Sequence, residues 1–347
     1  MLSIEASKLH AVASALFMAV GTPEDITSEV VDILIESNLT GHDSHGVQLI
    51  PGYMKLAQKG AVVATARPRI VEETATTALV SGNWGWGQYT AAYGTNLGIE
   101  KAKVTKIAAI AMVECNHVGR LGEYSERASR SDMAMIATLG SAGSADGPSG
   151  STAPFGGRKG VLGTNPFSFG IPTGEEPDVL LDFATTVVAG NKVAVARAKG
   201  VQLPPGALLD KDGNPSTDPA DLANGGVMLP FGGHKGYALA VCAELLGNVV
   251  APVYKFRGPG RYGGTFFVVF DPMMFATPAE YGAATDVVVR RIREVPPAPG
   301  FDEVMLPGGP ENKSRVERGA QGVPVPEATW DALITTGNGL GLRVESI

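Results

Sequence analysis

Cysteine is scarce in this chain of 347 residues, which carries only Cys115 and Cys242. The two lie far apart and form no Cys-x-x-Cys pattern. A disulfide framework and a structural zinc site are therefore not expected, and a reducing cytoplasm is the expected compartment. The N-terminus also lacks a basic segment followed by an apolar one, so we expect no secretion signal.

Basic runs and long apolar runs are missing as well. Lys and Arg number 28 against 35 Asp and Glu, the net charge is -7, and aromatic residues make up 7%. An acidic chain of this kind is not expected to have nucleic acid or an anionic membrane as its main partner. No uninterrupted apolar stretch reaches the roughly 20 residues that a membrane-spanning helix needs.

The composition that remains is that of a folded domain, with 44% hydrophobic residues, 18% charged residues and 45 glycines. Short apolar runs typical of buried strands alternate with segments of helical periodicity, which predicts a mixed α/β (α+β) architecture. The predicted strands cover residues 107–113, 133–139, 179–183 and 265–271. The predicted helices cover residues 4–20, 23–40, 47–59, 90–103, 122–130, 237–246, 286–294, 311–318 and a segment after Pro326.

The segment with the most reactive side chains is Gly41-His42-Asp43-Ser44-His45-Gly46. The helix before it has clear boundaries, with Thr22 as the expected N-cap, Pro23 as the first helical residue and Gly41 as the stop. A rigid helix therefore leads into a short polar loop. Catalytic residues are often found in loops that a rigid element positions.

Four of the five histidines lie in loops flanked by glycine, namely His42, His45, His117 and His234. Histidine is the side chain best suited to proton transfer near neutral pH. One loop histidine is most often structural, but four in such settings favour acid/base chemistry. The candidates are His45, which follows a helix, and His117, which follows a predicted buried strand.

The same residues allow two other chemistries. His42 and His45, with His117 or Asp182 as a third ligand, could hold zinc in a metal-dependent hydrolase or lyase, although no His-Glu-x-x-His is present. Ser44 could act as a nucleophile, but Gly-x-x-Ser-x-Gly differs from the nucleophile elbow, and adjacent serine and histidine do not normally pair as nucleophile and base. Both hypotheses are weaker than proton transfer.

A second glycine-rich segment, Gly232-Gly233-His234-Lys235-Gly236, directly precedes a predicted apolar helix. Backbone N–H groups at a helix start and the Lys235 cation suit a cofactor phosphate, while the structural alternative is an ordinary helix start. A third segment, residues 258–263, matches Gly-x-Gly-x-x-Gly but precedes a strand, so we do not interpret it as a dinucleotide fingerprint. A dinucleotide would therefore bind without the usual fingerprint.

Taken together, these segments resemble the type 2 malate/L-lactate dehydrogenase family of nicotinamide-dependent oxidoreductases. The resemblance covers nearly the whole chain and rests on Gly41–Val47, Asn116–Tyr124, Pro154–Gly157, Leu162–Pro166, Asp182–Thr185 and Pro230–Tyr237. It implies a non-Rossmann fold, NAD or NADP as cofactor, and a homodimer. The implied domains are a mainly helical one from residues 1–75 plus 305–347 and a cofactor-binding α/β domain over residues 76–304.

The resemblance also implies roles for individual residues. His45 matches the family's proton donor or acceptor, His117 matches the histidine given that role in some members, and Asp182 matches an acid that pairs with His45. The residues implied at the substrate are Ser44, Gln48, Arg120 and Thr164. The implied cofactor contacts are Asp182, Phe183, Ala184, Thr185, His234, Lys235, Gly236, Pro307 and Gly308.

One position departs from the family pattern. Members often carry an arginine three residues after the catalytic histidine to hold the substrate carboxylate, and here that residue is Gln48. Either Arg120 or Lys192 then holds the carboxylate, or the substrate is not a simple 2-keto acid. The expected reaction is hydride transfer at C2 of a 2-hydroxy/2-keto acid, with a cyclic 2-imino acid as the alternative. An alternative function is that of a cofactor-binding protein that has lost catalytic activity.

Overall fold

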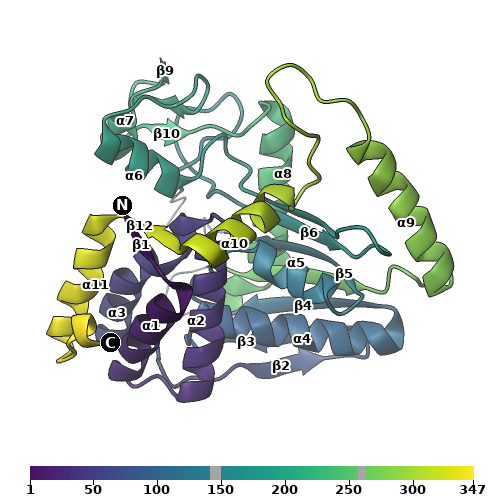
Figure 1. Cartoon of the computed structure of the whole chain (residues 1–347), viewed down its shortest axis with the longest axis horizontal. Coiled ribbons are helices and arrows are strands. Elements are labelled where there is room, and N and C mark those ends of the chain that lie inside the picture. Colours follow the sequence, from purple (N-terminus) through teal and green to yellow (C-terminus); the bar gives the residue numbers. More distant parts are fainter. Residues whose placement is uncertain (141–149, 257–262) are drawn as a thin grey trace.

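The computed structural model describes residues 1–140, 150–256 and 263–347. Most of the glycine-rich loop at 140–152 and of the Gly-x-Gly-x-x-Gly segment lies outside these residues. Within them, helices and strands alternate around one large mixed sheet, which confirms the mixed α/β prediction (Figure 1).

Seven strands form this sheet, in the order β2-β3-β4-β11-β5-β6-β7. β3 and β4 are parallel, and every other neighbouring pair is antiparallel. The strands are β2 (Arg69–Glu73), β3 (Thr77–Ser81), β4 (Ile107–Val113), β5 (Ala134–Leu139), β6 (Phe167–Ile171), β7 (Val179–Phe183) and β11 (Thr265–Phe270).

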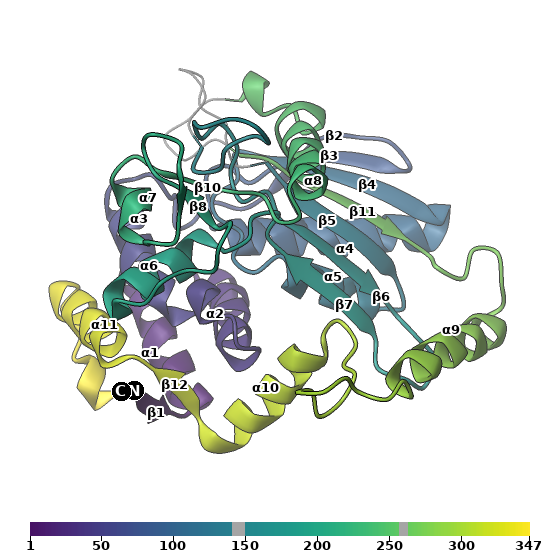
Figure 2. The same cartoon turned by 90° about the horizontal axis from the view of Figure 1, so that it is seen from above.

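Two helices, α4 (Gly87–Thr105) and α5 (Gly122–Ser129), cover one face of the sheet (Figure 2). α4 packs against alternate residues of β4, which belong to the central apolar core, and α5 packs against β5 and β6. The segment 251–256 packs against the intervening residues of β3 and β4 on the opposite face. Because side chains of a strand alternate between faces, both faces of β4 are apolar, as its uninterrupted hydrophobic run predicted.

The two ends of the chain meet beside the sheet (Figure 1). β1 (Leu2–Ile4) pairs antiparallel with β12 (Val323–Val325). The helices whose apolar faces share one core around this pair are α1 (Ala6–Ala19), α2 (Glu24–Leu39), α3 (Ile50–Gln58) and α11 (Glu327–Gly339). The segment Gly41–Gly46, called the histidine loop below, lies between α2 and α3 in the chain. It is therefore found where these helices adjoin the sheet.

A small three-stranded sheet lies in the chain between β7 and β11 of the large one. Its elements are β8 (Leu208–Leu209), β9 (Pro215–Ser216), β10 (Val227–Met228), α6 (Gly190–Lys199) and α7 (Ala220–Ala223), several of which share a separate apolar core. The remaining helices are α8 (His234–Leu245), α9 (Pro278–Arg293) and α10 (Gly309–Gln321). Short helical turns occupy Asp43–His45, Val47–Leu49, Leu246–Val250, Val253–Lys255 and Val344–Ser346.

The predicted start of α2 is wrong, whereas its predicted end is right. Pro23 occupies the cap position, and the Thr22 hydroxyl does not cap the helix. Instead, Thr22 Oγ1 accepts a hydrogen bond of 3.1 Å from the indole Nε1 of Trp86. Gly41 has a φ of +85°, a left-handed conformation that glycine adopts readily and that ends a helix.

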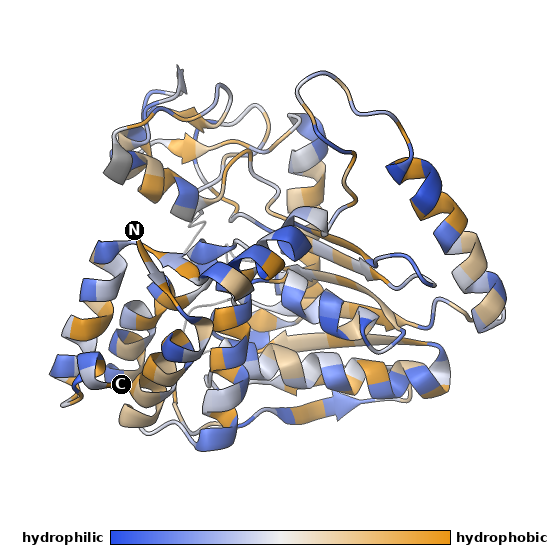
Figure 3. Cartoon of the chain, in the orientation of Figure 1, coloured by the Kyte–Doolittle hydropathy of each residue, from blue (hydrophilic) through white to orange (hydrophobic). Residues whose placement is uncertain are grey.

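One apolar helical stretch is more exposed than the sequence suggested. His234–Lys255, with a mean hydropathy of 1.5, is long and apolar enough to cross a membrane, and 33% of its apolar 18-residue stretch is buried. The sequence did not predict such a stretch because polar residues interrupt the apolar run. Figure 3 shows apolar residues along α8, and Leu245, Val249 and Val250 are each more than half exposed.

Candidate active site

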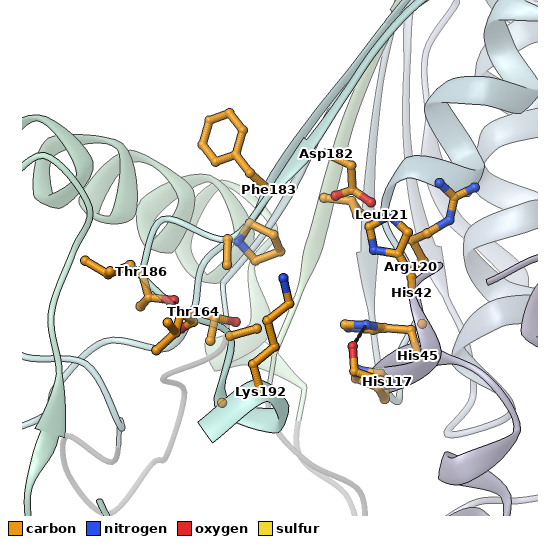
Figure 4. Close-up of a pocket in the computed structure, with 18 residues that line it drawn as sticks. His42, His45, His117, Arg120, Leu121, Thr164, Asp182, Phe183, Thr186 and Lys192 are labelled. Carbon is orange, nitrogen blue, oxygen red and sulfur yellow. Dashed lines mark hydrogen bonds between the residues drawn. The ribbon is translucent and has the colours of Figure 1, made fainter. Parts of the chain in front are cut away.

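The histidine loop faces the end of β7 and the start of α6 across a cavity of about 440 Å³. Figure 4 shows His45 and His117 on one side of this cavity and Lys192 reaching into it from α6. The structure brings together site residues that were predicted from distant segments. Those that line the cavity are Ser44, His45, His117, Arg120, Thr164, Asp182, Phe183 and Ala184.

Two helices anchor the histidine loop. Asn38, in α2, donates from Nδ2 to Asp43 Oδ1 at 2.8 Å and accepts from the Val47 backbone N–H at 2.8 Å. Arg318, in α10, donates to Asp43 Oδ1 at 2.6 Å. A Cβ at Gly46 would lie 2.1 Å from Asn38 Oδ1, so only glycine fits there without displacing the anchor. The loop is therefore held from both ends of the chain.

The two candidate histidines stack on each other. Their ring centroids lie 5.7 Å apart with an angle of 18° between the planes. His45 Nδ1 lies 2.9 Å from Ser44 Oγ, and His117 Nδ1 lies 2.6 Å from the hydroxyl of Tyr53. Tyr53 was not predicted as a site residue, because an aromatic residue at helical spacing is most often part of a core.

The surroundings of His45 keep its ring neutral. Burial of the ring lowers its pKa, and the neighbouring His117, His42 and Arg120 lower it further, to about 3. A neutral imidazole has a lone pair that can accept a proton. His45 is therefore neutral in the free protein, and an anionic ligand nearby would raise the pKa of its ring towards the range of proton transfer.

The expected pairing of Asp182 with His45 is not formed among the described residues. Asp182 Oδ2 accepts a hydrogen bond of 2.8 Å from the backbone N–H of Gly122, the first residue of α5. Burial raises the pKa of Asp182, while the nearby Arg120 and His42 lower it. The helix start offers a free N–H group and a partial positive charge, which explains why the carboxylate lies there. The prediction that Asp182 orients His45 is therefore wrong for this structure.

The Ser44 hydroxyl does lie within hydrogen-bond distance of the adjacent His45, contrary to the sequence-based expectation. A serine nucleophile would also need an acid to orient its histidine, and Asp182 does not pair with that ring. Metal binding by the histidines gains no support either. In the part of the chain that the structure describes, the residues close enough to share an ion are Glu36, Glu123 and Glu126.

Those glutamates belong to a buried cluster behind the cavity. Arg120 donates to Glu126 at 3.1 Å and to Glu123 at 3.4 Å, and its Nε has no hydrogen-bond partner. Glu126 also pairs with Arg130 and Arg315, which lower its pKa. Arginine side chains therefore balance the charge of these glutamates, as a metal ion would otherwise do. Among the described residues, the ion pair that Glu123 forms is with Arg120, and burial raises the pKa of Glu123 to about 7.

Glu123→Gln is expected to stabilise the protein at pH 8 but not at pH 4.5. The pKa of Glu123 is raised from 4.5 to about 7 in the folded state, so the folded chain loses stability as pH rises through this window. The neutral amide removes that loss, a gain on the order of 2 kcal/mol at pH 8. Urea unfolding at both pH values measures the free energy of unfolding of the wild type and the variant. Glu100→Gln, at an exposed position, is the control, and equal effects of Glu123→Gln at both pH values would contradict the prediction.

Several predicted cofactor residues surround an adjoining cavity of about 370 Å³. Asp182 and Phe183 line both cavities, and Pro307 and Gly308 line only the second. The backbone N–H of Leu180 donates to the Pro307 carbonyl at 3.0 Å, which fixes this segment to the edge strand β7. The two cavities together provide the volume and the concave shape that small-molecule sites have.

The predicted anion site lies at the start of α8. Gly232 and Gly233 have φ values of +56° and +62°, and the His234 and Lys235 side chains are exposed. Gly236 is buried, and a Cβ there would lie 2.2 Å from the Phe231 carbonyl oxygen. Gly236 therefore has a packing role, whereas the exposed cation at the helix start suits an anion.

Two further predicted residues do not line either cavity. Gln48 is partly buried in the Val47–Leu49 turn but does not contribute to the cavity wall. Thr185 is fully buried, and its hydroxyl donates to the Thr164 carbonyl at 2.9 Å. Its neighbour Thr186 lines the cavity instead. Thr185 thus holds the wall in place.

A model of the malate/L-lactate dehydrogenase family matches residues 4–334. Among curated proteins, hydroxycarboxylate dehydrogenase B of Escherichia coli is 32% identical, and the match covers 99% of this chain and 96% of that protein. The Δ1-pyrroline-2-carboxylate/Δ1-piperideine-2-carboxylate reductase of Pseudomonas putida is 31% identical over 69% of this chain and 68% of that protein.

A solved structure shows the same fold. The sulfolactate dehydrogenase from Methanocaldococcus jannaschii is 30% identical, has a TM-score of 0.89 and covers 99% of each chain. The similarity therefore includes both chain ends, the large sheet and the small three-stranded sheet. The span matched by the family contains every residue that lines the first cavity.

Proposed function

Since the chain belongs to the malate/L-lactate dehydrogenase family, we propose that this oxidoreductase transfers a hydride between a nicotinamide cofactor and C2 of a small 2-hydroxy/2-keto acid. The observation that carries the proposal is the cavity in which the neutral His45, stacked on His117, faces the Lys192 side chain. These groups match the needs of a 2-hydroxy acid, which has a hydroxyl proton to be moved and a carboxylate to be held.

The proton transfer is assigned to His45. Its neutral ring can accept the proton of the C2 hydroxyl during oxidation. In the reverse direction, the carboxylate of a bound keto acid would favour the protonated ring, which then donates to the C2 oxygen. His117, next to it in the stack, would donate a hydrogen bond to the same oxygen.

Binding of the substrate carboxylate is assigned to Lys192. Its side chain is exposed within the cavity wall and forms no ion pair with any described carboxylate. Arg120, the other candidate, is 4% exposed and already shares its charge with Glu123 and Glu126. Lys192 is therefore the more available cation, and it would take over the role that an arginine has at the position of Gln48 in other members.

The described residues fit a dinucleotide. Phe183, at the end of β7, lines a cavity together with Pro307 and Gly308, and its ring centroid lies 5.3 Å from that of Phe231, which directly precedes the glycines at the start of α8. Gly308 has a φ of +94° and a Cβ there would lie 3.0 Å from Leu180 Cβ, so glycine allows this segment to pack closely against β7. When bound, the nicotinamide supplies or accepts the hydride.

A cyclic 2-imino acid is the second candidate substrate. The Pseudomonas putida relative is named for such reduction, and the neutral Gln48 relaxes the expected arginine contact. A ring nitrogen would take the proton in place of the C2 oxygen.

The test begins with titration of the purified protein by NADH and NADPH, followed by reduced-nicotinamide fluorescence. We expect saturable binding, and the nucleotide that binds with the higher affinity is the preferred cofactor. A panel of 2-keto acids and cyclic imino acids then identifies the substrate. Absence of binding at millimolar concentration would overturn the proposal, while binding without any turnover would favour a non-catalytic cofactor-binding protein.

We also propose that the protein is a cytoplasmic homodimer. Each chain would have two domains, one made of residues 1–75 plus 305–347 and the other of residues 76–304. The support for the dimer is the exposed apolar side of α8 and its extension, where Leu245, Val249 and Val250 are more than half exposed. A second copy that packs there would bury this surface and would explain a helix of high hydropathy in an acidic chain.

Val250→Asp is expected to convert the dimer into a monomer, because it places a charge in the centre of the proposed apolar contact. Sedimentation velocity at micromolar concentration measures the mass. Val104→Asp is the control, since Val104 is 82% exposed at the end of α4 and should leave the dimer intact. A monomeric wild-type chain, or a dimer that survives Val250→Asp unchanged, would contradict the assigned surface.

A further inference from the structure

Tyr53 connects the helical core to the active-site histidines. It lies in α3, is 7% exposed and packs its ring near Trp86, with 5.9 Å between ring centroids. Its hydroxyl lies 2.6 Å from His117 Nδ1. No site prediction included Tyr53, and the proton transfer assigned above does not use it.

The hydroxyl of Tyr53 has a second partner that fixes its direction. Gln88, fully buried at the start of α4, donates from Nε2 to the Tyr53 oxygen at 2.9 Å. Burial raises the pKa of Tyr53 well above its ordinary value, so the phenol keeps its proton. Because the oxygen already accepts from Gln88, the phenol proton is available for the only other partner that these contacts provide, His117 Nδ1.

A neutral imidazole carries one proton. When Nδ1 accepts from Tyr53, that proton must be on Nε2. We propose that Tyr53, oriented by Gln88, is a positioning residue that holds His117 in the Nε2–H tautomer, so that His117 donates a hydrogen bond to the substrate while His45 transfers the proton. The part of this statement that concerns the substrate rests on the proposed function, whereas the tautomer does not.

The orientation of Gln88 decides between two arrangements. Its Oε1 is buried without a hydrogen-bond partner. If the amide were reversed, Oε1 would accept the phenol proton, Tyr53 would accept from His117, and the histidine proton would lie on Nδ1. The two arrangements therefore predict opposite tautomers of the same ring. They can be told apart without substrate or cofactor.

The test is long-range ¹H–¹⁵N NMR of the full chain labelled at histidine nitrogen. The sequence has five histidines, and the His117 signals are assigned by their loss in His117→Gln. We expect a protonated Nε2 and an unprotonated Nδ1 for His117 in the wild type. A protonated Nδ1 in the neutral ring would overturn the proposal, whatever the kinetics show.

Tyr53→Phe removes one oxygen and keeps the packed ring, so we expect His117 to become a mixture of tautomers. Tyr89→Phe is the matched control, because the Tyr89 hydroxyl accepts from Arg67 and should not affect His117. If Tyr53→Phe does not fold, Gln88→Met tests the same chain of bonds from its other end. A His117 tautomer that stays unchanged in the folded variant would count against the positioning role.

In turnover assays, Tyr53→Phe should lower kcat by about 10- to 100-fold with little change in KM, as loss of an orienting partner typically does. An unchanged kcat together with an altered tautomer would overturn the catalytic part of the proposal. A wild type that turns over no substrate would instead refute the proposed function and leave the NMR result valid.

Discussion

His45→Ala is expected to lower kcat by about two to four orders of magnitude, the usual contribution of a general acid–base catalyst. The variant loses the ring that lies next to Ser44 and His117 in the cavity. The loop backbone should persist, because it is anchored through Asn38 and Arg318, which the substitution does not touch. Cofactor affinity should therefore remain close to that of the wild type. Steady-state kinetics and the fluorescence titration measure the two quantities separately.

His10→Ala is the matched control for this prediction. His10 is an exposed histidine in α1 that pairs with Asp32 and does not line the cavity. It should leave kcat unchanged. If His45→Ala turned over substrate nearly as fast as the wild type, the proton transfer would have to be reassigned to His117, the other histidine in the stack.

Lys192→Met is expected to raise KM for a carboxylate substrate by about 10- to 100-fold, because a charge-assisted hydrogen bond is lost while the length of the side chain is kept. Lys192→Arg should restore much of the affinity. The carboxamide of the same acid provides a further readout. If Lys192 recognises the carboxylate, the ratio of KM for amide and acid should fall towards one in Lys192→Met.

Lys211→Met, in the same small subdomain but outside the cavity, serves as the control. An unchanged KM in Lys192→Met would leave Arg120 as the carboxylate partner. That assignment is harder to test by deletion, because removal of Arg120 would leave Glu123 and Glu126 buried with fewer cations. Arg120→Lys, which retains a charge in the cluster, would then be the next variant.

The parts of the fold that the sequence predicted well are those with strong periodic signals. β4 coincides with the apolar run 107–113, and α2 ends where Gly41 interrupts it. β1, β6, β12 and α6 were not predicted. β1 and β12 are three residues long and are specified by pairing between the two chain ends, which no local pattern records. α6 is rich in small and β-branched residues and lacks a clear apolar stripe.

For the site, the sequence predicted which residues meet but not how they pair. His45, His117 and Asp182 do line one cavity. The partner of Asp182 could not be predicted, because the N–H of Gly122 becomes available only through the packing of α5 against β7. Tyr53 and Gln88 were missed for a related reason. Both have the spacing of core residues, and only the fold brings their polar atoms next to His117.

The attachment of α10 to the histidine loop has a consequence for biosynthesis. Arg318 binds Asp43, Ser314 Oγ donates to the Leu39 carbonyl, and Glu311 pairs with His42, so the loop depends on residues that are translated more than 260 positions later. While the ribosome is still adding residues before 309, the loop has no such partners and its charged groups remain in water. The histidine loop is therefore expected to reach its final arrangement only after α10 has been synthesised.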